Sequence, residues 1–226
     1  MNIIVEWMTT LLKWLYSLTA VIGVPSYGIA IILLTILIKS IIYPLTWKQM
    51  ASMRKTVDLQ PKLQAIQKKY KDDPQTMNTK VMELYKENNV NPAGGCLPLI
   101  IQLPIFWGLY RTLFNFNSYI TDPSQTHFLW FNLTQKDPYY ILAVLAAATS
   151  FLQTKVTSPT SAASGNDAAA TTQKTMLYIM PLFMGYITAT VPSGLGLYWV
   201  VMNIVSVLQQ LYINHKLDKE KEKAAA

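Results

Sequence analysis

Five apolar stretches alternate along the chain with polar segments. Each is long enough, or nearly so, to supply the roughly 20 residues with which an α-helix crosses a hydrocarbon core of about 30 Å. The pattern therefore predicts an all-α polytopic membrane protein whose core, residues 25–215, contains five transmembrane helices. Their expected ranges are about 27–46, 94–115, 139–154, 175–190 and 195–213.

Residues 1–24 follow a different pattern. Polar side chains recur at helical spacing, and apolar side chains lie largely on the opposite side. Such an amphipathic helix is typical of a segment that lies in the membrane interface rather than across the bilayer. A cleaved signal peptide fits poorly, because a basic start and a small-residue cleavage site are missing. The polar residues are Glu6, Thr9, Thr10, Lys13 and Ser17, and the apolar ones are Ile4, Trp7, Met8, Leu11, Leu12 and Leu15.

Residues 48–89 alternate charged and apolar positions. Two runs of apolar residues at spacings of three and four predict two amphipathic helices. Between them, Asp73 is suited to cap the second helix and Pro74 to occupy its first position. We therefore expect a helical hairpin. Its apolar stripes are Leu59, Leu63, Ile66 and Tyr70 in the first arm and Met77, Val81, Leu84 and Tyr85 in the second.

The distribution of charge orients the chain in a membrane. Of its 226 residues, 51% are hydrophobic and only 14% charged, yet the net charge is +7. Nine of the nineteen basic residues fall between Lys48 and Lys86, and four more lie in the last eleven positions. By the positive-inside rule, the hairpin, the Ser/Thr/Ala-rich loop 155–173 and the short charged tail 216–226 are expected in the cytoplasm. The N-terminus is then expected outside.

Polar side chains interrupt three of the predicted spans. Lys39 lies well inside the first, where a charge costs on the order of 2.5–3.5 kcal/mol on insertion scales. Lys39 could extend along its own stem to the interface, and the amides could simply bond between helices. Together, however, a positive charge and several amides without an acidic partner predict a hydrophilic groove for polar or acidic polypeptide. The candidate groove residues are Thr35, Lys39, Gln102, Trp199, Asn203 and Ser206.

Five separated blocks of the sequence resemble one known family. They are LLTILIKSIIYPLT, LQPKLQAIQKKY, NVNPAGGCLPLIIQLPIFWGLYR, DPYYILAVL and PSGLGLYWVVMN, and together they cover roughly residues 27–213 in order. The chain resembles the YidC/Oxa/Alb family of membrane protein insertases. The likeness is to short bacterial forms that lack the large periplasmic domain, and it implies a multi-pass protein of the bacterial plasma (inner) membrane.

The resemblance implies a function and residue roles. Family members insert nascent membrane proteins, alone or beside the Sec translocon, through a groove open to the cytoplasm and the lipid. Lys39 falls where relatives usually carry Arg, and Thr35 and Trp199 match positions that contact the substrate. Nascent membrane proteins and lipid are the implied partners, with the ribosome and Sec components beside them. The hairpin matches a recruitment segment, for which Lys62, Lys68, Lys69, Tyr70, Lys80 and Tyr85 are the candidates.

Other function classes lack their sequence signals. There is no phosphate-binding glycine loop, no nucleophile paired with a base and no metal-ligand cluster, because His127 and His215 are isolated. We therefore expect no enzyme activity, no cofactor and no metal. A small-solute or ion transporter would also place polar residues in its spans. Against it, five spans do not divide into inverted repeats.

Overall fold

Helices make up most of the computed structural model, which describes residues 2–90, 97–116, 123–157 and 175–225. Residues 158–173 of the predicted cytoplasmic loop and residues 94–96 of the second predicted span lie outside these ranges.

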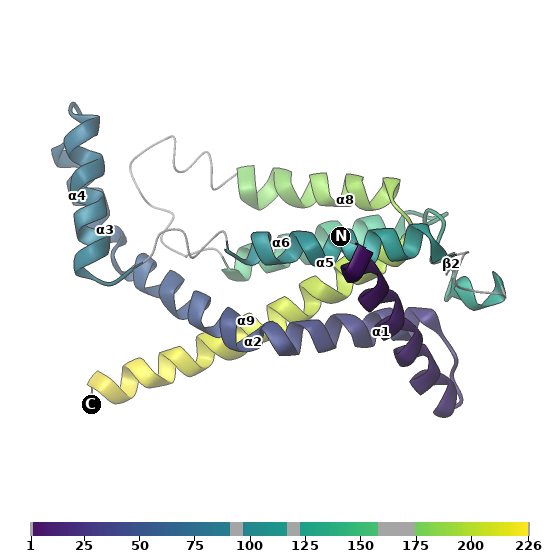
Figure 1. Ribbon diagram of the computed structural model, residues 1–226. Coiled ribbons are helices and arrows are strands. Elements are labelled where there is room, and N and C mark those ends of the chain that lie inside the picture. Colours follow the sequence, from purple (N-terminus) through teal and green to yellow (C-terminus); the bar gives the residue numbers. More distant parts are fainter. Residues whose placement is uncertain (1, 91–96, 117–122, 158–174, 226) are drawn as a thin grey trace.

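Two long helices cross one another and form the frame of the molecule (Figure 1). These are α2 (Tyr27–Asp58) and α9 (Ser193–Ala225). At about 1.5 Å per residue, each is close to 50 Å long, which exceeds the hydrocarbon core of a bilayer. Within the described residues, only these two helices contain segments both long and apolar enough to cross a membrane, Tyr27–Thr56 and Ser193–Glu220.

Both long helices continue past the spans expected from the sequence. In α2, residues 47–58 extend the helix because Lys, Gln, Met, Ala and Arg are good helix formers. The helix ends before Leu59 because Pro61 has no backbone N–H to continue the ladder. Similarly, α9 runs through most of the predicted tail rather than ending near residue 213.

Three shorter apolar helices pack beside these two. They are α5 (Leu97–Phe114), α6 (Ile141–Thr157) and α8 (Met180–Thr190), the last preceded by the π-helical turn η4 (Thr175–Ile179). Helices α6 and α8 lie side by side (Figure 1). Gly185 allows their close approach, because a Cβ at this position would lie 3.0 Å from the Ala147 Cβ and 3.1 Å from the Ala143 carbonyl oxygen.

Helix α1 (Asn2–Val21) packs against the start of α2 and the C-terminal half of α5. The hydroxyls of Thr9 and Thr112 are hydrogen-bonded at 3.3 Å, and the rings of Tyr16 and Tyr27 stack with centroids 4.1 Å apart. Thr9 is therefore buried, although the sequence pattern assigned it to the polar face, whereas Trp7 is exposed. The reason is that α1 has two apolar sides, one covering its neighbours and one facing outward. The outward side carries Ile3, Trp7, Trp14, Leu18 and Val21, and the buried side Met8, Leu12 and Leu15.

A short loop structure closes the end of the molecule opposite the hairpin and the C-terminus (Figure 1). It contains the 3₁₀ turn η3 (Pro123–Thr126) and the antiparallel strands β1 (His127–Phe128) and β2 (Phe131–Asn132). The Phe128 ring lies against Gly28 and leaves no room for a side chain there. Here the main core gathers residues from α1, α2, α5, α9 and the loop, among them Leu12, Ile31, Leu34, Leu109, Leu113, Phe131, Leu133, Leu195 and Tyr198.

The hairpin projects from the other end of the frame (Figure 1) and consists of α3 (Gln60–Lys69) and α4 (Pro74–Glu87). The predicted cap is confirmed, because the Asp73 carboxylate accepts a hydrogen bond from the Thr76 backbone N–H at 3.1 Å. Hydrogen bonding by the side chain of Thr76, and by this backbone N–H group, holds the pKa of Asp73 below its usual range. A separate hydrophobic cluster joins the two arms and consists of Leu59, Leu63, Leu84 and Val90, with Ile66, Val81 and Tyr85 beside it.

Candidate functional site within the membrane helices

The polar face of α2 points away from the exposed apolar side of this helix. Thr35 is 1% exposed, and its hydroxyl donates to the Ile31 carbonyl oxygen one turn earlier at 2.7 Å. Lys39 is partly buried on the same face. By contrast, Leu37 and Ile41 on the other side of the helix are exposed. Thr35 thus satisfies its hydroxyl within its own helix, and Lys39 is the charged group of this face.

The Lys39 ammonium lacks a carboxylate partner in the described part of the chain, whose two ion pairs lie elsewhere. The backbone carbonyl of Lys39 accepts a hydrogen bond from the Gln209 Nε2 atom of α9 at 3.3 Å. This contact ties α2 to α9 at the level of the charge. A partly buried cation without a counter-ion attracts negative charge, because its own hydration is incomplete.

The polar stripe of α9 also faces its protein neighbours. Asn203 is 2% exposed, and its amide nitrogen donates to the Thr149 and Ser150 hydroxyls of α6 at 3.1 and 2.9 Å. Ser206 is partly buried and donates to the Met202 carbonyl oxygen of its own helix. The side of α9 away from the stripe carries exposed Ile204, Leu208 and Leu211. Asn203 therefore joins α6 to α9, and Ser206 keeps its hydroxyl on its own helix.

Helix α5 contacts α9 through two neighbouring pairs. The Gln102 amide nitrogen donates to the Tyr198 hydroxyl, and the Phe106 ring stacks on Trp199 with centroids 5.1 Å apart. Gln102 and Trp199, both candidates from the sequence, are thus brought to one α5–α9 contact. Tyr198 and Phe106 were not among the residues predicted from the sequence. The available signals were the position of Phe106 one turn after Gln102 and that of Tyr198 beside Trp199.

Taken together, α9 is the common partner of the candidate residues. Its side chains bond to α2 through Gln209, to α5 through Tyr198 and to α6 through Asn203. The amides of Asn203 and Gln102 therefore hold helices together. Lys39 is the charged candidate among the six, and a polypeptide segment carrying negative charge is the ligand that it would attract.

The candidate residues of the hairpin divide into outward and packed groups. Lys62, Lys68 and Lys69 are exposed, while Tyr85 packs against the hairpin core, where burial raises the pKa of its hydroxyl. Lys69 lies 5.4 Å from the centroid of the Tyr70 ring. Lys80 forms an ion pair with Glu83 at 2.7 Å, and this hydrogen bond raises the pKa of the lysine. The hairpin thus presents a basic surface around an apolar centre.

Metal chemistry finds no support in the part of the chain that the structure describes. No group of three or more His, Cys, Asp or Glu side chains there could hold a metal ion.

Comparison with known proteins gives a consistent picture. The family described as 60Kd inner membrane protein matches residues 17–221. A membrane protein insertase YidC from Wolinella succinogenes is 43% identical over 217 residues, which are 96% of this chain and 38% of the relative. The protein of the same name from Fusobacterium nucleatum is 45% identical over 193 residues, which are 85% of this chain and 88% of the relative. One from Helicobacter pylori is 41% identical over 212 residues, but the chain spans only 36% of its length.

Proposed function

Because the chain belongs to the 60Kd inner membrane protein family, we propose that it is a membrane protein insertase. It receives nascent membrane proteins beside Lys39 and releases their helices sideways into the bilayer. The observation that carries this proposal is Lys39 itself, a partly buried charge on a membrane-length helix without a carboxylate partner among the described residues. The relatives named above are insertases rather than enzymes, and the proposal includes no catalytic residue.

The proposed topology has five transmembrane helices, with α5, α6 and α8 crossing the membrane beside α2 and α9. Its orientation is supported by the arrangement of charge, because the basic hairpin and the basic C-terminus lie at one end of the frame (Figure 1). The loop with β1 and β2 lies at the other end. By the positive-inside rule, the first end is cytoplasmic and the second is outside. The N-terminus then lies outside. Helix α1 lies in the interface on the outer side of the same membrane, a position that suits its exposed tryptophans Trp7 and Trp14.

The proposed mechanism is electrostatic and requires no bond to be made or broken. Lys39 and the water that it retains reduce the cost of bringing a polar segment partway into the bilayer. Acidic residues on that segment are attracted to Lys39, because a charge pair interacts more strongly in surroundings of low dielectric constant than in water. The apolar helix that follows leaves for the lipid, driven by burial of apolar surface at about 25 cal/mol per Å².

Each candidate residue has a proposed role in this mechanism. Gln102, Trp199 and Ser206 line the groove in which the substrate lies, and Thr35 forms its wall beside Lys39. Asn203 keeps α6 against α9, as its two hydrogen bonds indicate. The exposed lysines of the hairpin recruit the substrate, and the ribosome and Sec translocon are the further proposed partners.

Site-specific photo-crosslinking tests the proposal. A photoreactive aromatic amino acid is placed at Gln102 on α5 or Trp199 on α9, and at the exposed positions Ile41 and Leu208 as matched controls on the lipid-accessible sides of α2 and α9. We expect adducts to a stalled nascent membrane protein from the first pair and not from the controls. Equal adducts at all four positions, or none with a folded protein, would contradict the groove and direct attention to solute transport.

A further inference from the structure

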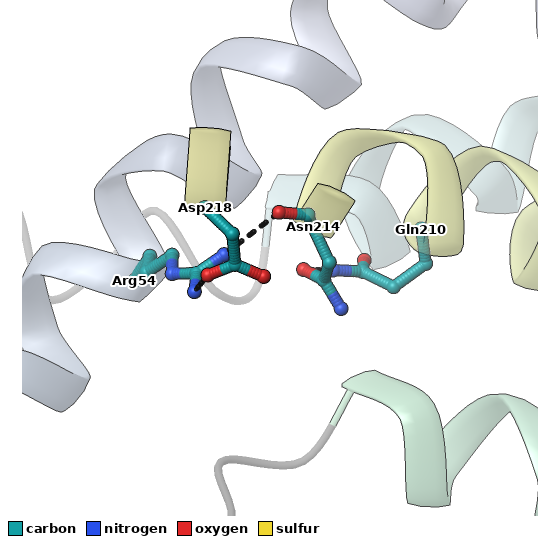
Figure 2. A network of polar contacts seen from close by, with 4 residues as sticks. All are labelled: Arg54, Gln210, Asn214 and Asp218. Atoms are coloured by element: carbon teal, nitrogen blue, oxygen red, sulfur yellow. Dashed lines mark hydrogen bonds and ion pairs between the residues drawn. The ribbon is translucent and has the colours of Figure 1, made fainter. Parts of the chain in front are cut away.

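Beyond the ranges 27–46 and 195–213 that the sequence predicts as spans, α2 and α9 are joined by a small polar network. Arg54 of α2 forms an ion pair with Asp218 of α9 and donates from Nη1 to the Asn214 backbone carbonyl oxygen at 3.2 Å. The Asn214 side chain in turn accepts from the Gln210 amide nitrogen at 2.9 Å. Figure 2 shows Arg54 reaching across from α2 to the turn of α9 that carries Asn214 and Asp218. Arg54 therefore binds a backbone carbonyl and a carboxylate that lie one turn apart on α9.

A second contact joins the same turn of α9 to an earlier turn of α2. The Lys216 ammonium lies 4.8 Å from the centroid of the Trp47 ring, within the range of a cation–π interaction. Trp47 precedes Arg54 by two helical turns. The two contacts therefore hold residues 47–58 of α2 at two points along the helix. We call Trp47, Arg54, Asn214, Lys216 and Asp218 the latch.

The latch lies on the hairpin side of a weak point in α2. Pro44 is inside this helix and has no backbone N–H to offer the carbonyl of Ser40. Helices bend most readily at such positions. The hydrophobic cluster of the hairpin is separate from the main core. A bend at Pro44 therefore moves residues 47–58 of α2, and the hairpin moves with them. Contacts with α9 oppose this movement.

We propose that the C-terminal extension of α9 positions the hairpin through the latch, and that Arg54 and Asp218 are positioning residues for substrate recruitment. The effect on substrate recruitment rests on the proposed function, whereas the position of the hairpin follows from the contacts between α2 and α9 alone. Arg54 and Asp218 are both partly accessible to water. An exposed pair of this kind changes an equilibrium by only about two- to fivefold, so the latch biases the hairpin toward one position and still lets it move.

Charge reversal with a distance measurement tests the latch. Spin labels are attached at the exposed positions Asn78 on α4 and Glu222 on α9, in the full chain with Cys96→Ala, reconstituted in lipid vesicles. The variants are Arg54→Glu, Asp218→Arg and the two together. The control is the same pair of reversals at Lys80 and Glu83, an exposed ion pair within α4 that does not join two helices.

We expect either single reversal in the latch to broaden and lengthen the distance distribution between the labels and to slow insertion of a client protein. The double variant should restore both, because the reversed pair again attracts. High salt should imitate the single reversals, since it screens exposed charges. Reversals at Lys80 and Glu83 should leave the distances unchanged.

Distances that do not change in the single variants would overturn the proposal. So would single variants whose defects the double variant fails to restore, because that result indicates damage to the fold. The distance measurement does not depend on insertion. A chain that shows the expected distances but inserts no client would therefore contradict the proposed function and leave the latch standing.

Discussion

Replacing Lys39 by glutamate should reduce insertion of clients with acidic translocated segments by about tenfold or more, whereas Lys39→Arg should be tolerated. Two unit charges 4 Å apart interact by about 4 kcal/mol at an effective dielectric constant of 20. Reversing the sign turns this attraction into repulsion in surroundings that are only partly hydrated. Arginine keeps the positive charge at the same place. The measurement is the rate at which a radiolabelled client becomes protease-protected in vesicles that contain each variant.

Two controls separate the effect of the site from that of net charge. Lys155→Glu makes the same change of charge at an exposed position at the end of α6, and should leave insertion close to that of the unmodified chain. A client whose translocated segment has no acidic residue should be much less sensitive to Lys39→Glu. If the acidic client inserts equally well with glutamate at position 39, the electrostatic mechanism is wrong.

The second large effect is expected at the opposite end of the molecule. Asp137 is 4% exposed, and its carboxylate accepts from the Trp130 indole N–H at 3.1 Å and from the backbone N–H groups of Tyr139 and Leu142 at 3.1 and 2.6 Å. Asp137→Ala removes the acceptor. The Leu142 N–H is buried and loses its partner, whereas Trp130 and Tyr139 are exposed and their N–H groups can bond to water instead. Since a buried unpaired donor costs about 1–3 kcal/mol, we expect a loss of about 1–3 kcal/mol.

For a chain of this size, such a loss corresponds to a melting temperature lower by roughly 2–12 °C. Thermal unfolding of the purified protein in detergent measures it. Lys136→Ala, at the exposed neighbouring residue, is the matched control and should melt within experimental error of the unmodified chain. If Asp137→Ala unfolds at the same temperature as the control, the carboxylate does not hold the loop to the start of α6.

Much of the fold could be predicted from periodicity. The apolar segments of α2 and α9, the two arms of the hairpin and the cap at Asp73 all follow local rules, in which a few neighbouring residues decide the structure. The lengths of α2 and α9 could not. Charged residues such as Lys48 and Lys219 favour helix in water as well as Leu does, so composition marks where the apolar part ends and not where the helix ends.

The candidate site was harder to predict, because the hydrogen-bond partners of a polar side chain depend on how the helices pack together. The sequence shows that Asn203 needs hydrogen-bond partners, but not that Thr149 and Ser150 supply them. Likewise, Thr9 was assigned to a polar face because its side chain is polar, and only the neighbouring Thr112 of α5 explains its burial. Arg54 and Asp218 are 164 residues apart, and neither charge is distinguished in the sequence from others nearby.

The most direct test of the insertase proposal uses the purified chain alone in lipid vesicles. A short client with an acidic N-terminal segment is added as it is synthesised, and its integration is measured by protection from protease and resistance to extraction. The proposal predicts integration that rises with the amount of the chain in the membrane and is lost with Lys39→Glu. Integration no greater than in vesicles without the chain, accompanied by uptake of a small solute or ion, would contradict the proposal and identify a transporter.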